Sequence, residues 1–194
     1  MVGVIMFFGY MRCLPHILII KTHRKGGVIK LDIKHWLAVQ NKSLPLIKGF
    51  VHLMVSYPEF RNLFYYRIGG YATFIHFLYR KKPSLYLSTS QIGSGLYIQH
   101  GDASIIAAKS IGKNCWINQG VTVGYTKSGK TPFIGDRVTI NAGAKVLGGI
   151  RIGNDVVIGA NAVVVKDVPD NCTVVGVPAY IVKRDGIKVR EELK

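Results

Sequence analysis

The sequence has few cysteines, which disfavours the classes of protein that disulfides or cysteine-bound zinc hold together. Its 194 residues contain three, Cys13, Cys115 and Cys172, which lie far apart and form no CxxC pair. A disulfide framework and a cysteine-based zinc site are both disfavoured, and a reducing cytosol is the expected compartment. The glycines follow no three-residue period and 48% of the residues are apolar, which excludes collagen and disorder. The length suits one globular domain with an appendage.

Acidic residues are also scarce, because 26 Lys+Arg face only 10 Asp+Glu, a formal net charge of +16. The excess is concentrated in residues 1–84, which contain 13 basic and 2 acidic residues. A basic surface attracts nucleic acid, anionic lipid or phosphorylated small molecules. No aromatic-interleaved or groove-reading motif accompanies the charge, so nucleic acid is not an expected partner.

The N-terminal stretch 2–20 is mostly apolar and leads into a cluster of basic residues. Arg12 and His16 interrupt it, which disfavours a spanning helix, and no small-residue cleavage site marks a signal peptide. Two interpretations of residues 1–25 stay open, a helix buried in the protein and a helix attached to a membrane surface. The protein is expected in the cytoplasm, either free or at the inner face of the membrane.

Residues 1–84 are predicted to form a basic, helical N-terminal region that ends at Pro83. Pro58 and Glu59 are placed as a helix start, since proline fits the first helical position and an acidic side chain suits the first turn. Apolar residues recur at three- and four-residue steps over 32–38, 44–55 and 58–79.

A six-residue apolar period then organises the chain. One series steps by six from Ile134 to Val164 and contains only isoleucine and valine, and a second runs from Val138 to Val168. A period of six matches neither strand alternation nor a helix. It indicates a solenoid of short strands, in which one apolar side chain per face points inward and stacks on those of neighbouring coils.

The spacing also predicts a loop. Eleven residues, rather than six, separate Val123 from Ile134, so five residues within 125–130 leave the coil. Residues 124–131 satisfy the GxxxxGK[ST] pattern of phosphate-binding loops. That pattern cradles phosphate only where a helix N-terminus follows, and here Pro132 leads into the next hexad. A nucleotide-hydrolysing role is therefore disfavoured.

Four segments of the repeat region carry a family resemblance: IGSGLYIQH at 92–100, QGVTVG at 119–124, INAGAKVLG at 140–148 and VGVPA at 175–179. They resemble the hexapeptide-repeat acyltransferases, most closely the serine acetyltransferase branch, which also contains O-acetyltransferases of capsule and exopolysaccharide synthesis. The helical part matches more loosely, at 32–33 and 66–69.

The resemblance implies an α+β fold. The helical N-terminal region 1–84 would be followed by a left-handed parallel β-helix over 85–183, and then by a C-terminal tail, 184–194. It also implies a homotrimer with active sites between neighbouring prisms.

Acetyl transfer from a thioester to a hydroxyl needs a base near the alcohol. His100 lies two residues after the inward-pointing Ile98 and is the only one of the six histidines in the repeat region. By spacing alone, a surface or structural role is the alternative. The resemblance implies that His100 is the catalytic base, taking the proton from an acceptor hydroxyl directly, with no acyl-enzyme.

The resemblance further implies acetyl-CoA as cosubstrate, with the small residues Gly124, Ala142 and Ala160 facing its pantetheine arm. Small corner residues that merely permit tight turns are the alternative. Lys183 is a candidate phosphate contact by charge alone. No metal is expected, because thioesters are already activated and no His/Asp/Glu cluster has ligand spacing.

The chain also departs from the family pattern. Family serine acetyltransferases resemble one another in an Arg-His-Pro run after the loop, where this chain has Lys130-Thr131-Pro132, and in an aspartate directly before the first histidine, where it has Gln99. Lys130 and Thr131 are therefore candidate substrate contacts, and Gln99 or Asp102 is a candidate to orient the base. The acceptor is expected not to be free serine.

Three functions remain as expectations. The first is an acetyl-CoA-dependent O-acetyltransferase acting on a sugar hydroxyl of a surface polysaccharide or its precursor. The second is serine O-acetyltransferase of cysteine biosynthesis, which the departures disfavour. The third is a non-catalytic trimeric scaffold on the same fold, which a failure to bind coenzyme A would favour.

Overall fold

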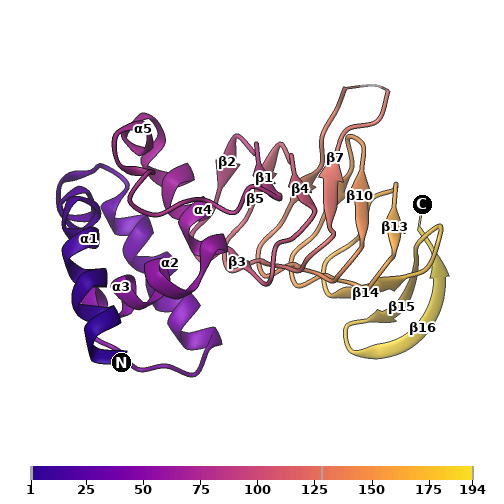
Figure 1. The fold of residues 1–194 in the computed structure, drawn as a ribbon. Helices are drawn as coiled ribbons and strands as arrows, with labels where there is room; N and C mark the ends of the chain where they lie inside the picture. The colour runs from indigo at the N-terminus through magenta and orange to yellow at the C-terminus, as the bar shows by residue number, and fades with distance from the viewer. Residues whose placement is uncertain (1, 128, 194) are drawn as a thin grey trace. The chain divides into compact units, whose positions relative to one another are not determined.

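A computed structural model describes residues 2–127 and 129–193, with side chains from Phe8 onward (Figure 1). The chain divides into two compact units, Met1–Pro83 and Ser84–Lys194. We call the first the helical unit and the second the solenoid unit.

The helical unit packs around a cluster of aromatic side chains. Trp36 lies edge-on to Phe60, with ring centroids 5.3 Å apart, and Phe50 contacts Phe64 at 5.3 Å. Among the described residues, no helix is both long and apolar enough to cross a membrane. The helical elements are α1 (Val2–Thr22), α2 (Gly26–Val39), α3 (Leu46–Ser56), α4 (Pro58–Ile68), η1 (Gly69–Tyr71) and α5 (Ala72–Ile75).

Pro58 occupies the first turn of α4 as predicted, with Glu59 beside it. The helical pattern over 58–79 does not form a single helix. The α-helix ends at Ile68 because Gly69 adopts a φ of 57°, a left-handed conformation that glycine adopts without steric cost. Short helical turns then continue to Ile75.

Buried polar groups tie the helices of this unit together. Arg67 on α4 donates two hydrogen bonds to the carboxylate of Asp32 on α2, at 2.8 and 3.1 Å, and both side chains are buried. His16 on α1 is fully buried, and its Nε2 lies 3.0 Å from the Tyr65 hydroxyl oxygen. Tyr65 donates its proton to the carbonyl of Tyr79 at 2.9 Å, so His16 Nε2–H is the donor to Tyr65. Burial lowers the pKa of His16 from 6.5 to about 4.

Acid is therefore expected to destabilise the helical unit through His16. The unfolded chain binds a proton at this histidine near pH 6.5 and the folded chain only near pH 4. Stability is thus lost as the pH falls through this window and changes no further below it, a loss of about 3 kcal/mol. Far-UV circular dichroism during thermal unfolding, recorded across this window, measures the loss. His16→Gln should flatten the dependence and His76→Gln, at an exposed histidine, should not; equal curves for all three proteins would contradict this origin.

The solenoid unit is built from three sheets of short strands that stack coil on coil (Figure 1). Sheet A contains β1 (Leu85–Leu87), β4 (Ser104–Ile106), β7 (Thr122–Gly124), β10 (Lys145–Leu147) and β13 (Val163–Val164). Sheet B contains β2 (Gln91–Ile92), β5 (Ser110–Ile111), β8 (Phe133–Ile134) and β11 (Arg151–Ile152). Sheet C contains β3 (Tyr97–Ile98), β6 (Trp116–Ile117), β9 (Thr139–Ile140), β12 (Val157–Ile158), β14 (Cys172–Val175), β15 (Tyr180–Arg184) and β16 (Ile187–Glu192).

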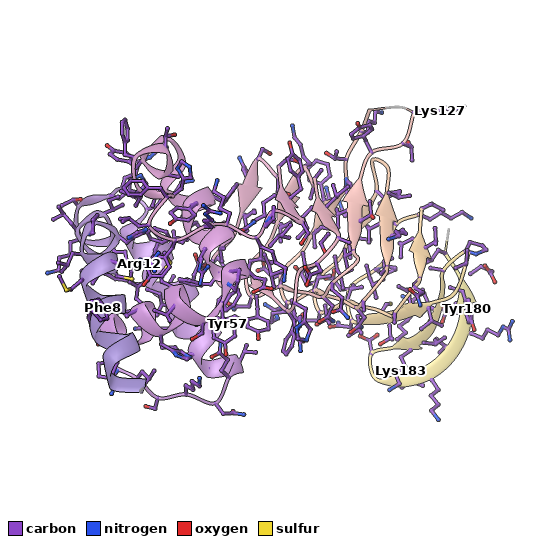
Figure 2. The ribbon with its side chains drawn as sticks, in the orientation of Figure 1. Phe8, Arg12, Tyr57, Lys127, Tyr180 and Lys183 are labelled. Carbon is purple, nitrogen blue, oxygen red and sulfur yellow. The ribbon has the colours of Figure 1, made fainter. Side chains whose placement is uncertain are left out.

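The hexad period positions the solenoid core. Every member of the two predicted apolar series is buried, because each hexad places its member of each series inside the coil. Neighbouring coils pair in parallel, as between Lys145 and Val163 in sheet A. Thr122 pairs with Lys145, so this coil is longer and its extra residues form the predicted loop, which Figure 2 shows with Lys127 at its outer end.

The last residues of the chain are folded rather than a tail. The predicted tail, 184–194, instead contains β16, which pairs antiparallel with β15 and extends sheet C. Arg184 and Glu191 form an ion pair at 2.5 Å across this hairpin, and the side chain of Leu193 is buried. Figure 2 shows Tyr180 and Lys183 on the same hairpin. The hairpin lacks the hexad period, so the pattern that predicted the coils could not predict it.

Candidate active site

His100 lies in an enlarged corner between sheets C and A. Eight residues separate Ile98 from Ile106 here, whereas the equivalent step from Ile117 to Val123 is six. His100, Gly101 and Ala103 all have positive φ, at 63°, 61° and 50°. Positive φ is uncommon for residues other than glycine and tends to cluster at functional sites. The corner therefore holds two extra residues, with His100 near its start.

The imidazole of His100 is exposed, and no described side chain or backbone group hydrogen-bonds to it. Asp102, a candidate to orient it, instead accepts a hydrogen bond from the Ser84 hydroxyl at 2.9 Å. The carbonyl of Asp102 accepts from the Gly120 amide at 2.8 Å. Asp102 thus ties the corner to adjacent coils, while the ring of His100 is presented to solvent.

Two of the three predicted small residues, Ala142 and Ala160, share an edge of the solenoid with His100. His100, Ala142 and Ala160 each lie two residues after the last residue of a sheet C strand, namely β3, β9 and β12. These strands stack in one sheet with β6 between β3 and β9, so the residues that follow them form a column. We call this column, with Gln119 as its remaining member, the histidine edge.

A row of polar side chains runs beside the histidine edge. The indole Nε1–H of Trp116 is 3.2 Å from both Gln99 Oε1 and Asn118 Oδ1, and Asn118 Nδ2 donates to Asn141 Oδ1 at 3.2 Å. The indole bond directs the Gln99 carbonyl oxygen towards Trp116 and leaves its NH2 group as the donor on the outer side. We did not predict Trp116, Asn118 or Asn141. The available signal was the polar residue that directly follows sheet C strands in successive coils.

A second group of predicted residues lies on another edge. Gly124 ends β7 in sheet A, and its carbonyl accepts from the Gly148 amide at 3.0 Å. Lys130 and Thr131 follow on the loop that joins β7 to β8 of sheet B. These residues lie between sheets A and B, whereas His100 lies between sheets C and A. We call this second group the loop edge, and one chain does not bring it together with the histidine edge.

No described neighbour of Gly124 explains why this position is a glycine. A Cβ added at Gly124 would meet nothing within 4 Å, and its φ is not in the left-handed region. At Gly143, by contrast, φ is 74° and an added Cβ would collide with the side chain of Asn161. Gly143 is therefore explained by its turn, and Gly124 is not.

The remaining candidate, Lys183, is an exposed residue of β15, which lies two strands beyond β12 in sheet C. In the part of the chain that the structure describes, no group of three or more His, Cys, Asp or Glu side chains has the geometry to hold a metal ion.

Comparisons with known proteins converge on one group of enzymes. The family model for the bacterial transferase hexapeptide (six repeats) matches residues 131–166. A serine acetyltransferase from Synechococcus elongatus is 37% identical over 165 residues, which are 75% of this chain and 65% of that protein. The curated relatives are longer, since this chain spans from about half to about two thirds of their length.

Solved structures agree. The crystal structure of Neisseria gonorrhoeae serine acetyltransferase is 31% identical, with a TM-score of 0.61 over 87% of this chain and 69% of that one. Serine acetyltransferase from Brucella abortus strain S19, in complex with coenzyme A, is 27% identical with a TM-score of 0.63, over 87% and 72% of the two chains. The predicted fold class, helices followed by a left-handed parallel β-helix, is confirmed.

Proposed function

Because this chain belongs to the hexapeptide-repeat acyltransferase superfamily, in its serine acetyltransferase-like branch, we propose that it transfers an acetyl group from acetyl-CoA to a hydroxyl. One observation carries the proposal. The single histidine of the repeat region projects from an enlarged corner, in one column with the small residues Ala142 and Ala160. Acetyl transfer needs a base beside the acceptor hydroxyl, and the small side chains of Ala142 and Ala160 leave room for the long, flexible arm that carries the thioester.

In this mechanism His100 Nε2 accepts the proton of the acceptor hydroxyl as the oxygen attacks the acetyl carbonyl. The tetrahedral intermediate collapses, the C–S bond breaks, and the leaving thiolate takes the proton from the imidazolium. No acyl-enzyme forms. Gln99 and Asp102 support the corner that presents His100, and Lys183 is proposed as a phosphate contact of the carrier.

A homotrimer would complete the site. The histidine edge and the loop edge lie at different corners of one prism, so both can face one substrate only if they come from neighbouring copies. In this arrangement the carrier lies between Ala142 and Ala160 of one copy and Gly124 of the next. Lys130 and Thr131 of that next copy then approach the acceptor.

Serine is the acceptor that the comparisons favour, since the similar curated proteins and solved structures are named serine acetyltransferases. A sugar hydroxyl, of a surface polysaccharide or its precursor, is the second candidate. It is favoured by Gln99, where family members place an aspartate. A carboxylate pairs well with the ammonium group of an amino acid, whereas the neutral NH2 of Gln99 suits hydroxyl oxygens.

Release of free thiol from acetyl-CoA, measured with the purified chain and single acceptors, tests both candidates. Turnover with L-serine at a rate well above hydrolysis, and none with sugars or nucleotide sugars, supports serine O-acetyltransferase. The reverse pattern supports the sugar candidate. Binding of coenzyme A without turnover on any acceptor would contradict catalysis, and failure to bind it would favour the scaffold.

Gly124→Leu is expected to weaken coenzyme A binding without harming the fold. An added Cβ at this buried glycine meets no described atom within 4 Å, so the longer side chain is expected to extend towards the carrier. An overpacked contact costs about 1–3 kcal/mol, or roughly 10–100-fold in Kd. Isothermal titration with coenzyme A measures Kd, and thermal unfolding measures Tm. Gly27→Leu, at an exposed glycine of α2 where an added Cβ also meets no described atom within 4 Å, is the control. An unchanged Kd in Gly124→Leu would remove Gly124 from the carrier site.

A further inference from the structure

Helix α1 is apolar on two opposite faces. Gly9, Cys13, His16 and Ile20 are buried against the rest of the helical unit. The opposite face carries large apolar side chains at three- and four-residue steps, all between 55% and 63% exposed: Phe8, Met11, Leu14 and Leu18. A soluble amphipathic helix keeps this outer face polar. Met11, Leu14 and Leu18 thus give α1 an apolar outer face that is exposed to solvent.

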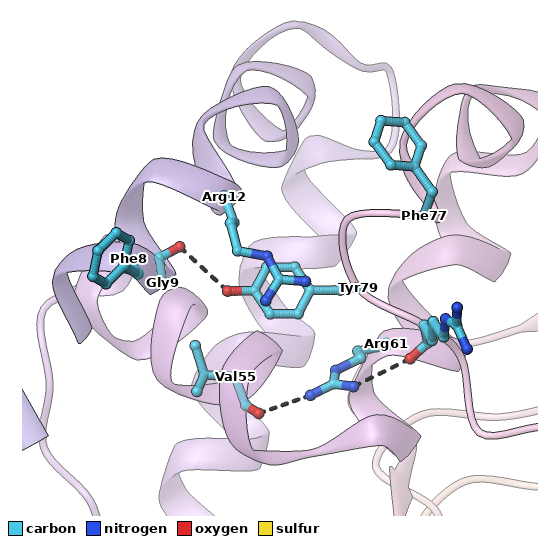
Figure 3. A pocket seen from close by; sticks show the side chains of 8 residues that line it. Phe8, Gly9, Arg12, Val55, Arg61, Phe77 and Tyr79 are labelled. Carbon is cyan, nitrogen blue, oxygen red and sulfur yellow. Dashed lines mark hydrogen bonds between the residues drawn. The ribbon is translucent and has the colours of Figure 1, made fainter. Parts of the chain in front are cut away.

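Exposed aromatic side chains also lie in and beside α5. Tyr71, Phe74 and Phe77 follow one another at three-residue steps and are 58–76% exposed. Phe77 and Phe8 line the same open pocket of ≈ 560 Å³. Figure 3 shows these two aromatic rings on opposite sides of that pocket. Exposed patches of this kind mark interaction sites.

The pocket between these aromatic rings is lined by arginines and by no acid. Arg12 lies over the Tyr79 ring, 4.4 Å from its centroid, and Arg80 lines the same wall. Arg61 donates hydrogen bonds to the backbone carbonyls of Met54, Val55 and Arg80; Figure 3 shows the bond to Val55. A second hollow of ≈ 440 Å³ joins Arg24 and Lys25 to Tyr71 and Phe74.

The acids of the helical unit do not neutralise these cations. Residues 1–84 contain two acidic residues. Asp32 pairs with Arg67 and Glu59 pairs with Lys82, at 2.8 Å in each case. The arginines around the apolar face thus keep their full positive charge, which attracts anions and repels another copy of the same surface.

We propose that the helical unit docks on an anionic phospholipid bilayer. The outer face of α1, with Phe74 and Phe77, lies in the headgroup and acyl boundary, and Arg12 and Arg80 bind lipid phosphates in the pocket beside Phe8. Interfacial helices with apolar faces and flanking basic residues bind membranes in this way. The inference goes beyond acetyl transfer and does not depend on it.

Co-sedimentation with vesicles tests the proposal on the full chain. We expect binding to vesicles of phosphatidylcholine mixed with phosphatidylglycerol, weaker binding to phosphatidylcholine alone, and a decrease with rising salt. The charge-reversal variant Arg12→Glu/Arg80→Glu should reduce partitioning about tenfold or more. Lys188→Glu, at an exposed residue of β16, should leave it unchanged.

A second pair of variants tests the apolar face. Leu14→Asp/Leu18→Asp should also reduce partitioning about tenfold or more, whereas Ile187→Asp, at an exposed isoleucine of β16, should not. Thermal unfolding and light scattering accompany each variant. Equal binding to neutral and anionic vesicles, or full binding by both paired variants, would overturn the proposal. A change of oligomeric state in Leu14→Asp/Leu18→Asp, with no change in lipid binding, would assign the face to another copy of the chain.

Discussion

His100→Ala is expected to lower kcat for acetyl transfer by about 10²–10⁴-fold, the usual contribution of a positioned general base. The acceptor hydroxyl is a poor nucleophile until its proton is removed, and His100 is the only histidine of the repeat region. Initial rates of thiol release from acetyl-CoA, with the acceptor found by screening, measure the loss. His100→Asn should lose as much, because an amide does not accept the proton.

The loss should occur without unfolding, because the ring of His100 is exposed and has no hydrogen-bond partner in the described residues. Tm is therefore expected to stay unchanged, and so is the Kd for coenzyme A. His76→Ala, at an exposed histidine of the helical unit, is the matched control and should retain full activity. Wild-type turnover in His100→Ala would end its assignment as the base.

Two inactive variants are expected to restore activity when they assemble together. His100→Ala disables the histidine edge and Gly124→Trp blocks the loop edge, and each homotrimer should be inactive. If every site joins the histidine edge of one copy to the loop edge of the next, any mixed trimer contains one intact site. Mixed trimers, isolated from co-expression through two different tags, should therefore show about one third of wild-type activity.

A matched mixture controls for artefacts of co-expression. Ala160→Trp alters the histidine edge itself, so its mixture with His100→Ala contains no intact histidine edge and should stay inactive. Equal activity of the two mixtures would refute a site shared between copies. Light scattering that shows a monomer would refute it as well.

The solenoid could be predicted because its physical cause is local in the sequence. The apolar side chains of each hexad point into the coil, so the series from Ile134 to Val164 and from Val138 to Val168 predicted the buried positions. The break in spacing after Val123 predicted the loop for the same reason. The hairpin of β15 and β16 has no such period, and its pairing depends on the coil that precedes it.

The candidate site could be predicted only in part. His100 and the small residues follow aliphatic hexad positions, which the sequence shows directly. The bonds that join Trp116 to Gln99 and Asn118 to Asn141 cross from coil to coil, and they form only after the coils have stacked. The exposed apolar face of α1 could not be predicted either, because a run of apolar residues does not show which of its side chains will be buried.

The sequence by itself determined which side chains point into the prism, where its loop leaves the coil and which histidine lies in the repeat region. Only the tertiary structure decided that His100 shares an edge with Ala142 and Ala160, while Gly124 and Lys130 lie on another. The reason is geometric. The edge of the prism on which a residue lies depends on where the chain turns from one sheet to the next. The turn at His100 is two residues longer than its equivalents, and the turn after Gly124 is five residues longer. The positions of both turns are fixed only when each coil packs against the next.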